Sequence, residues 1–148
     1  MFFKLSERSR GVISTLAIRC KDFKFISPTV LGDYLVTFPK LVELDLLRFQ
    51  NSINDSALSK MLNACTKTLV GFKLGYGAGS ATLGLGSLST VALCKCRKLK
   101  RLILGDPEDF HKPKALDGRL FNLKKLAQYK QFSLEYLTLY QADGFIID

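Results

Sequence analysis

The sequence lacks the groups of residues on which most enzymes and metal sites depend. His111 is the only histidine among the 148 residues, and no serine, cysteine or carboxylate can be assigned to a catalytic group around it. Cys20, Cys65, Cys94 and Cys96 do not have the spacing of a zinc site. We therefore expect a protein that is not an enzyme, with no catalytic residue, metal or cofactor, in which the cysteines are small buried thiols.

Long apolar runs are also absent. No run reaches the ~18 residues that a membrane-spanning helix needs, and the apolar start of the chain is shorter than the core of a secretory signal. Arg8, Arg10 and Arg19 are compatible with a mitochondrial presequence, whereas Glu7 counts against one. We expect an intracellular, reducing compartment, with the cytoplasm and the mitochondrial matrix both open.

The glycine-rich stretch GYGAGSATLGLGS, residues 75–87, lacks both common nucleotide-binding motifs. After Gly75 and Gly77, a dinucleotide fingerprint needs a third glycine where Ser80 stands. A P-loop needs a lysine where Leu85 follows Gly84. We therefore interpret the stretch as a turn, in which glycine lets neighbouring segments approach closely.

Acidic residues are fewer than basic ones, and the imbalance is local. The net charge is +9: residues 1–25 carry +4 and residues 95–130 carry +7, whereas residues 26–94 and 131–148 carry +1 and −3. Helix C-termini favour cations, but this preference explains only a few of them. We predict a basic docking patch for RNA or for an acidic protein surface, with both partners open. Its residues are Lys95, Arg97, Lys98, Lys100, Lys124 and Lys125.

An apolar-x-x-apolar-x-apolar pattern occurs five times along the chain. The copies begin at Ile13, Leu41, Leu69, Leu99 and Leu134, with separations of 28, 28, 30 and 35 residues. Within each copy the fourth and sixth positions alternate with variable residues, as in a strand with one buried face. The pattern predicts five short strands of one repeating architecture.

Between these strands the apolar spacing becomes helical. It predicts helices over 53–65, 85–96 and 117–129, and a further helix that Ser27 and Pro28 open. Asp55 and Asp117 are predicted to cap two of them. The core-facing positions predicted for the first three connections are Val30, Leu31, Tyr34, Leu35, Phe38, Ile53, Ala57, Leu58, Met61, Leu62, Cys65, Leu85, Leu88, Val91, Ala92 and Cys96. Each unit is therefore a strand, a turn and a helix.

These units resemble the leucine-rich repeats, specifically the cysteine-containing, ribonuclease-inhibitor-like subtype associated with F-box proteins. In that subtype a helix ends in Cys-Pro-x-Leu before the next strand, and this chain has FPKLVELDL from Phe38 and CRKLKRLIL from Cys96. INDSALSKML, residues 53–62, is similar to the subtype's helix entry. The Asn or Cys that the family places after each strand is missing, so the turns must be held in another way. Residues 105–114 form an insertion, and insertions in repeat proteins usually lie on one face.

The resemblance implies one leucine-rich-repeat domain over residues 1–148, with strands beginning near 13, 41, 69, 99 and 134. The expected fold is an α/β, right-handed solenoid with a short curved parallel sheet inside and helices outside. Its variable strand positions would form a concave, partner-binding face. Aligning the copies assigns to this face Thr15, Arg19, Glu43, Asp45, Lys73, Tyr76, Arg101, Ile103, Tyr136, Thr138 and Tyr140.

A preformed face with tyrosine, arginine and mixed charges is typical of protein recognition. We therefore expect a non-catalytic scaffold or adaptor, an accessory subunit in a larger assembly, with mitochondrial and ribonucleoprotein assemblies both open. The resemblance implies a second class, the substrate-recognition arm of an F-box-type ubiquitin ligase. Twelve residues precede the first copy and leave no room there for an F-box, which favours the adaptor.

Overall fold

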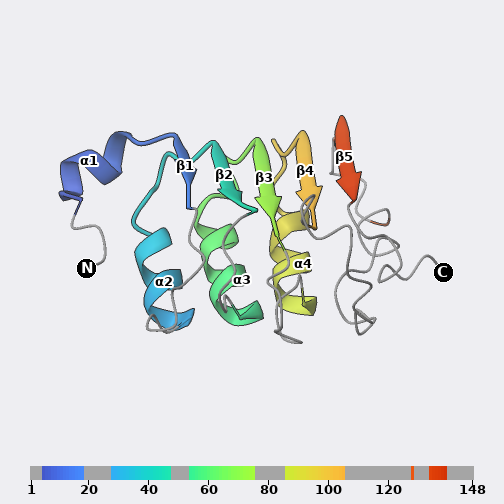
Figure 1. Ribbon diagram of the computed structural model, residues 1–148, viewed down its shortest axis with the longest axis horizontal. Coiled ribbons are helices and arrows are strands. Elements are labelled where there is room, and N and C mark those ends of the chain that lie inside the picture. Colours follow the sequence, from blue (N-terminus) through green and yellow to red (C-terminus); the bar gives the residue numbers. More distant parts are fainter. Residues whose placement is uncertain are drawn as a thin grey trace.

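The computed structural model describes residues 5–18, 28–47, 54–75, 86–105, 128 and 134–139. These residues form an α/β structure around a five-stranded, all-parallel sheet (Figure 1), which confirms the predicted fold class at this level. The strands are β1 (Thr15–Ala17), β2 (Glu43–Leu46), β3 (Gly71–Leu74), β4 (Arg101–Leu104) and β5 (Tyr136–Leu139). The helices are α1 (Glu7–Val12), α2 (Pro28–Leu35), α3 (Asp55–Ala64) and α4 (Ser87–Cys94).

The strands lie in the sheet in the order in which they follow one another along the chain. Their register places Thr15, Glu43, Gly71, Arg101 and Tyr136 side by side. This is the alignment that the apolar pattern predicts, because each of these residues stands two positions after the apolar residue that opens its copy. The predicted strand positions are therefore confirmed.

A ladder of apolar side chains covers one face of the sheet. In β2, Leu44 and Leu46 are buried, whereas Glu43 and Asp45 are only partly covered. The alternation follows from the opposite orientation of successive side chains in a strand. The same core contains further buried residues of β3 and β4 and the leucines that open the second, third and fourth copies, namely Leu41, Leu69, Phe72, Leu74, Leu99, Leu102 and Leu104.

Helices α2, α3 and α4 stand in a row beside the sheet (Figure 1), and α3 packs against both neighbours. Helix α3 buries Ala57, Leu58, Met61 and Leu62, which confirms the stripe predicted for it. These residues recur at steps of three and four, and they therefore share one side of a helix with 3.6 residues per turn.

Two positions predicted to face the core are exposed instead. Val30 of α2 and Leu88 of α4 are 57% and 56% exposed. In α4 the buried side includes Ser89, whose backbone N–H and hydroxyl both donate to Asp55 of the preceding unit. This contact sets the rotation of α4 about its axis and leaves Leu88 outside.

Asp55 has a different role from the one predicted. Asn54 caps α3, because its side-chain oxygen accepts a bond of 2.8 Å from the N–H of Ala57. The Asp55 carboxylate instead accepts from the backbone N–H groups of Leu88 (3.1 Å) and Ser89 (2.9 Å) at the start of α4. A carboxylate at the N-terminus of a helix accepts hydrogen bonds from otherwise unpaired N–H groups and interacts favourably with the positive end of the helix dipole. Asp55 therefore caps the helix of the next unit.

The structure contains a helix, α1, that the sequence analysis did not predict. Ser6 caps it by accepting a bond of 3.2 Å from the N–H of Ser9, and Glu7 lies in its first turn. Leu5 and Ile13, on either side of α1, pack against the core. The arrangement of Ser6, Glu7 and Ser9 is the signal that could have indicated it.

Two predicted elements lie outside the described residues. They are the insertion after Gly105 and the helix over 117–129 with its cap Asp117, of which only Gln128 is described. No helix within the described ranges is long and apolar enough to cross a bilayer.

The leucine ladder should dominate the stability of the fold. Leu46 and Leu104 are fully buried, so we expect Leu46→Ala or Leu104→Ala to lower the free energy of unfolding by about 2–5 kcal/mol. Chemical denaturation followed by circular dichroism measures this loss. Val30→Ala, at an exposed helical position, serves as the control and should have little effect, and equal effects at all three positions would contradict the assignment of the buried face.

The cap that Asp55 provides to α4 can be tested separately. We expect Asp55→Ala to cost about 0.5–2 kcal/mol, because two backbone N–H groups lose their acceptor. Asp33→Ala removes an exposed carboxylate that pairs with Lys60, and it should change stability by less than about 1 kcal/mol. Thermal unfolding of both variants is the measurement. A larger loss for Asp33→Ala than for Asp55→Ala would refute the capping role.

Candidate interaction surfaces

Two columns of side chains stand on the sheet face opposite the leucine ladder. The first column consists of Thr15, Glu43, Gly71, Arg101 and Tyr136, and the second of Ala17, Asp45, Lys73, Ile103 and Thr138. We call these residues the strand face. The structure therefore brings together eight of the eleven residues predicted for partner binding, whereas Arg19, Tyr76 and Tyr140 lie outside the described residues.

An ion pair spans the first column. The Arg101 guanidinium donates to the Glu43 carboxylate, although β3 lies between their strands. Gly71 is the β3 residue between them, and a Cβ there would come within 1.7 Å of the Glu43 carboxylate. The glycine thus leaves the space through which the two charged side chains meet.

A second ion pair lies in the other column. Lys73 Nζ is 3.5 Å from the Asp45 carboxylate on the neighbouring strand. Asp45 also accepts a bond of 3.0 Å from the backbone N–H of Leu47, just after β2. This bond holds the chain where it leaves β2. The charges of the described strand face therefore neutralise one another in pairs.

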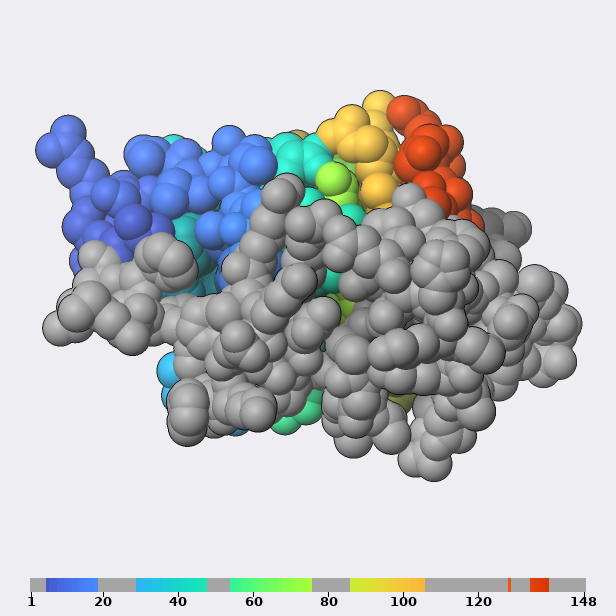
Figure 2. Space-filling model, viewed as in Figure 1, coloured from blue at the N-terminus to red at the C-terminus, as the bar shows by residue number. Residues whose placement is uncertain are grey.

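The end of the strand face at β5 is open to solvent. Tyr136 is 55% exposed and Leu137 is 44% exposed, although the residues aligned with Leu137 in β2, β3 and β4 are buried. In the space-filling view β4 and β5 form one continuous rim in yellow and red (Figure 2). An exposed tyrosine beside an arginine is the kind of group that anchors protein interfaces.

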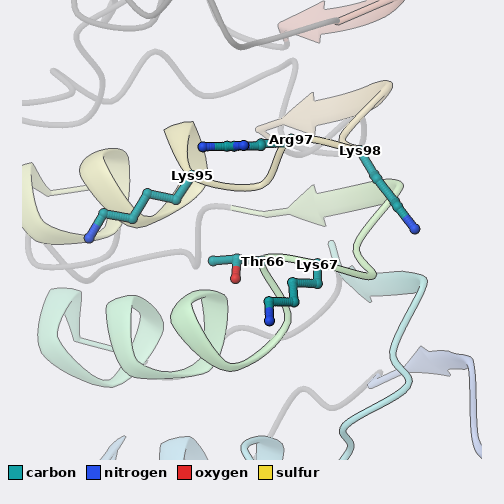
Figure 3. A pocket seen from close by; sticks show the side chains of 5 residues that line it. All are labelled: Thr66, Lys67, Lys95, Arg97 and Lys98. Atoms are coloured by element: carbon teal, nitrogen blue, oxygen red, sulfur yellow. The ribbon is translucent and has the colours of Figure 1, made fainter.

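A second polar surface lies on the turns that lead from the helices into the strands. Thr66 and Lys67 follow α3, and Lys95, Arg97 and Lys98 follow α4. Together they line an open groove of about 630 Å³ (Figure 3). We call these five residues the turn edge. The four cationic residues are exposed, and no described carboxylate pairs with any of them.

The turn edge differs in membership from the predicted basic patch. Lys100 does not line the groove, because it pairs with Glu135 at 2.7 Å. Lys124 and Lys125 lie outside the described residues. The predicted basic patch did not include Thr66 and Lys67, because they belong to the preceding unit. The 30-residue separation of the copies aligns Lys67 with Arg97 and is the signal that could have indicated Lys67.

Three cysteines lie in the core as thiols. Cys65, Cys94 and Cys96 are all buried, as predicted, and Cys20 lies outside the described residues. Burial raises the pKa of Cys65 to about 12, against a smaller lowering by a backbone hydrogen bond. Burial, and then the thiols of Cys65 and Cys94, raise the pKa of Cys96 to about 12. Within the described ranges no group of three or more His, Cys, Asp or Glu residues is placed to hold a metal ion.

The first glycine of the glycine-rich stretch permits a close approach between units. A Cβ on Gly75 would lie 1.9 Å from the carbonyl oxygen of Leu47, so only glycine fits here without a shift of the backbone. The N–H of Gly75 donates to the carbonyl of Leu46 at 3.2 Å. Both contacts agree with the interpretation of this stretch as a turn that lies close to its neighbour. Residues 76–85 and His111 lie outside the described residues.

The described residues thus form an α/β protein with a parallel sheet and two polar surfaces, one internally paired and one not. No family model, curated protein or solved structure matched the chain in comparisons with each.

The buried thiols should be unreactive in the folded protein. With a pKa of about 12, Cys65 and Cys96 are ionised to only about one part in ten thousand at pH 8, and the thiolate is the reactive form. We expect iodoacetamide to alkylate these thiols in a Cys20→Ser variant only after denaturation. Mass spectrometry of native and denatured samples measures this, and modification of native protein at the rate of an exposed thiol would contradict it.

The same pKa values give a dependence of stability on pH. Unfolded thiols titrate near pH 8.5, so the raised folded-state pKa contributes stability that is complete below that pH and is lost as pH rises toward 12. The melting temperature should therefore fall above about pH 8.5, and less steeply in a Cys65→Ala/Cys96→Ala variant. Parallel slopes for the two proteins would show that these thiols do not contribute.

Proposed function

We propose that the protein is a non-catalytic leucine-rich-repeat interaction module, an adaptor or accessory subunit that binds a partner protein through the strand face. The observation that carries the proposal is the strand face itself, on which residues about 28–30 positions apart are aligned in two columns and held by ion pairs. Such a face is ordered before the partner arrives, so less conformational entropy is lost on binding.

Three features support the repeat architecture. The apolar pattern recurs at each of the five strands, one helix stands between successive strands from β1 to β4, and the strands pair in chain order. Repeat proteins of this design stack units that contact only their neighbours, in a right-handed path. The same features are what a leucine-rich-repeat solenoid requires.

The chemistry of the strand face favours a protein partner over a polyanion. Glu43 and Asp45 place negative charge beside Arg101 and Lys73, so no uniform positive track is present among the described strand residues. A partner of mixed charge can complement such a pattern, and the pattern rejects surfaces whose charges are misplaced. Tyr136 adds an aromatic anchor at the open end.

A second candidate is the substrate-recognition arm of an F-box-type ubiquitin ligase. The observation that favours it is the equivalent placement of Phe38, Cys65 and Cys96 at the helix ends. Each donates its N–H to a leucine three residues earlier, and its carbonyl accepts from the leucine that opens the next copy. This is the place of the cysteine in the F-box-associated repeat subtype.

The strand face can be tested by comparing the partners that wild-type and variant proteins retain. We expect Arg101→Ala/Tyr136→Ala to lose the main partner in affinity purification followed by mass spectrometry. The melting temperature should change only slightly, because both side chains are exposed and a solvent-exposed ion pair contributes less than about 1 kcal/mol. Lys60→Ala, on α3, is the control and should retain the partner.

The identity of the retained proteins separates the two candidates. Ubiquitin-ligase subunits that remain with the double variant would indicate the F-box-type arm, because that assembly would be joined through another region. Retention of every partner by the double variant would refute binding through the strand face.

A further inference from the structure

The turn edge concentrates positive charge that the described part of the chain does not neutralise. Five of the six described carboxylates are engaged elsewhere, four of them in ion pairs with Lys60, Lys73, Lys100 and Arg101 and one as the cap of α4. The sixth, Glu7, lies in α1. Lys67, Lys95, Arg97 and Lys98 therefore face solvent without an opposing charge among the described residues.

The dipole of α4 accounts for Lys95 at its C-cap, but helix dipoles do not account for the other three cations. Neither α3 nor α4 has a basic residue in its last turn, where a cation gains most from the C-terminal partial charge. Lys67, Arg97 and Lys98 come later, in the turns before β3 and β4. Since the effect of the dipole falls off within about one turn, the charges need another explanation.

The cations come from two successive turns and are spread along the open groove that they line. Lys67 comes from one turn and Lys95, Arg97 and Lys98 from the next, and in Figure 3 Lys95 and Lys98 point away from each other on either side of Arg97. Lys40 stands exposed at the equivalent place before β2, since it and Lys98 both directly precede the leucine that opens a copy. An extended, open arrangement fits an elongated anion better than a single compact one.

We propose that the turn edge binds the phosphate backbone of a nucleic-acid duplex without reading its sequence. Lysine and arginine side chains contact the phosphates on the outside of a duplex, and such contacts supply most of the non-specific affinity. Thr66 adds a hydroxyl of the kind that contacts phosphate oxygens. The inference does not rest on the function proposed for the strand face, because the two surfaces share no residue.

The lining residues argue against the other polyanions. Among the described residues that line the groove, none has an aromatic side chain on which unpaired bases could stack, as single-strand sites require. None of these five described residues is an apolar one that could anchor a protein partner or enter a bilayer. Affinity must therefore come from charge, and a duplex presents charge at the highest density.

Fluorescence anisotropy with a short mixed-sequence DNA duplex, over a salt series, tests the proposal. If Lys67, Lys95, Arg97 and Lys98 each meet one phosphate, the logarithm of the association constant should fall with the logarithm of salt with a slope of about −3.6. Arg97→Gln/Lys98→Gln should reduce that slope by about 1.8 and weaken binding at least about tenfold near 0.1 M salt.

Arg8→Gln/Lys60→Gln is the matched control, because it removes one arginine and one lysine from exposed positions on α1 and α3. It should leave the slope nearly unchanged, and circular dichroism checks that both variants fold. Equal weakening by the two double variants would overturn the proposal in favour of overall charge. Tighter binding of the single strand, or equal competition by polyglutamate at the same charge concentration, would overturn it in favour of an unpaired strand or an acidic protein.

Discussion

One constraint underlies the whole structure, namely that no unit can bury its own apolar face. A unit offers a strand of three or four residues and a helix of eight to ten, which is too little to surround a leucine side chain. Leu44 is buried because β2 lies between β1 and β3 and because the helices cover that face of the sheet. Neighbouring units therefore share one apolar core, and the stability of the fold depends on how they pack against one another.

Stacking also decides which polar groups meet. Adjacent strands lie about 4.8 Å apart, so residues one unit apart along the chain become close neighbours in space. Glu43 reaches Arg101 across Gly71, and Asp55 reaches from α3 to the start of α4. The first contact links units two apart and the second links successive units, and both add directional bonds to apolar packing that is itself non-directional. They help to fix the register that the leucine ladder requires.

The sequence allowed a correct prediction of what depends on local periodicity. The five strands, their alignment and the buried side of α3 follow from the alternation and the three-to-four spacing of apolar residues, which each segment carries by itself. The cap at Asp55, the exposed position of Leu88 and the Glu43–Arg101 pair depend on contacts between units, so the local pattern could not reveal them. The two columns of the strand face were predictable as well, because they follow from the same alternation of apolar and variable residues that predicts the strands. The inclusion of Lys67 in the turn edge was not, because it follows from how two turns sit beside each other.

The stack finally explains why charge is paired on one surface and unpaired on another. Columns of a parallel sheet align side chains of neighbouring strands, so Asp45 and Lys73 can neutralise each other there, and Glu43 and Arg101 do so across Gly71 of the strand between them. The turns before β3 and β4 carry cations on successive units, and like charges aligned in this way reinforce one another. Internally paired charges act only at short range and favour a partner of matching shape and polarity, whereas unpaired charges attract anions over about 8–10 Å at moderate salt. The turn edge is therefore suited to speed and orient encounters with an anionic surface, and the strand face to select a partner by close contact.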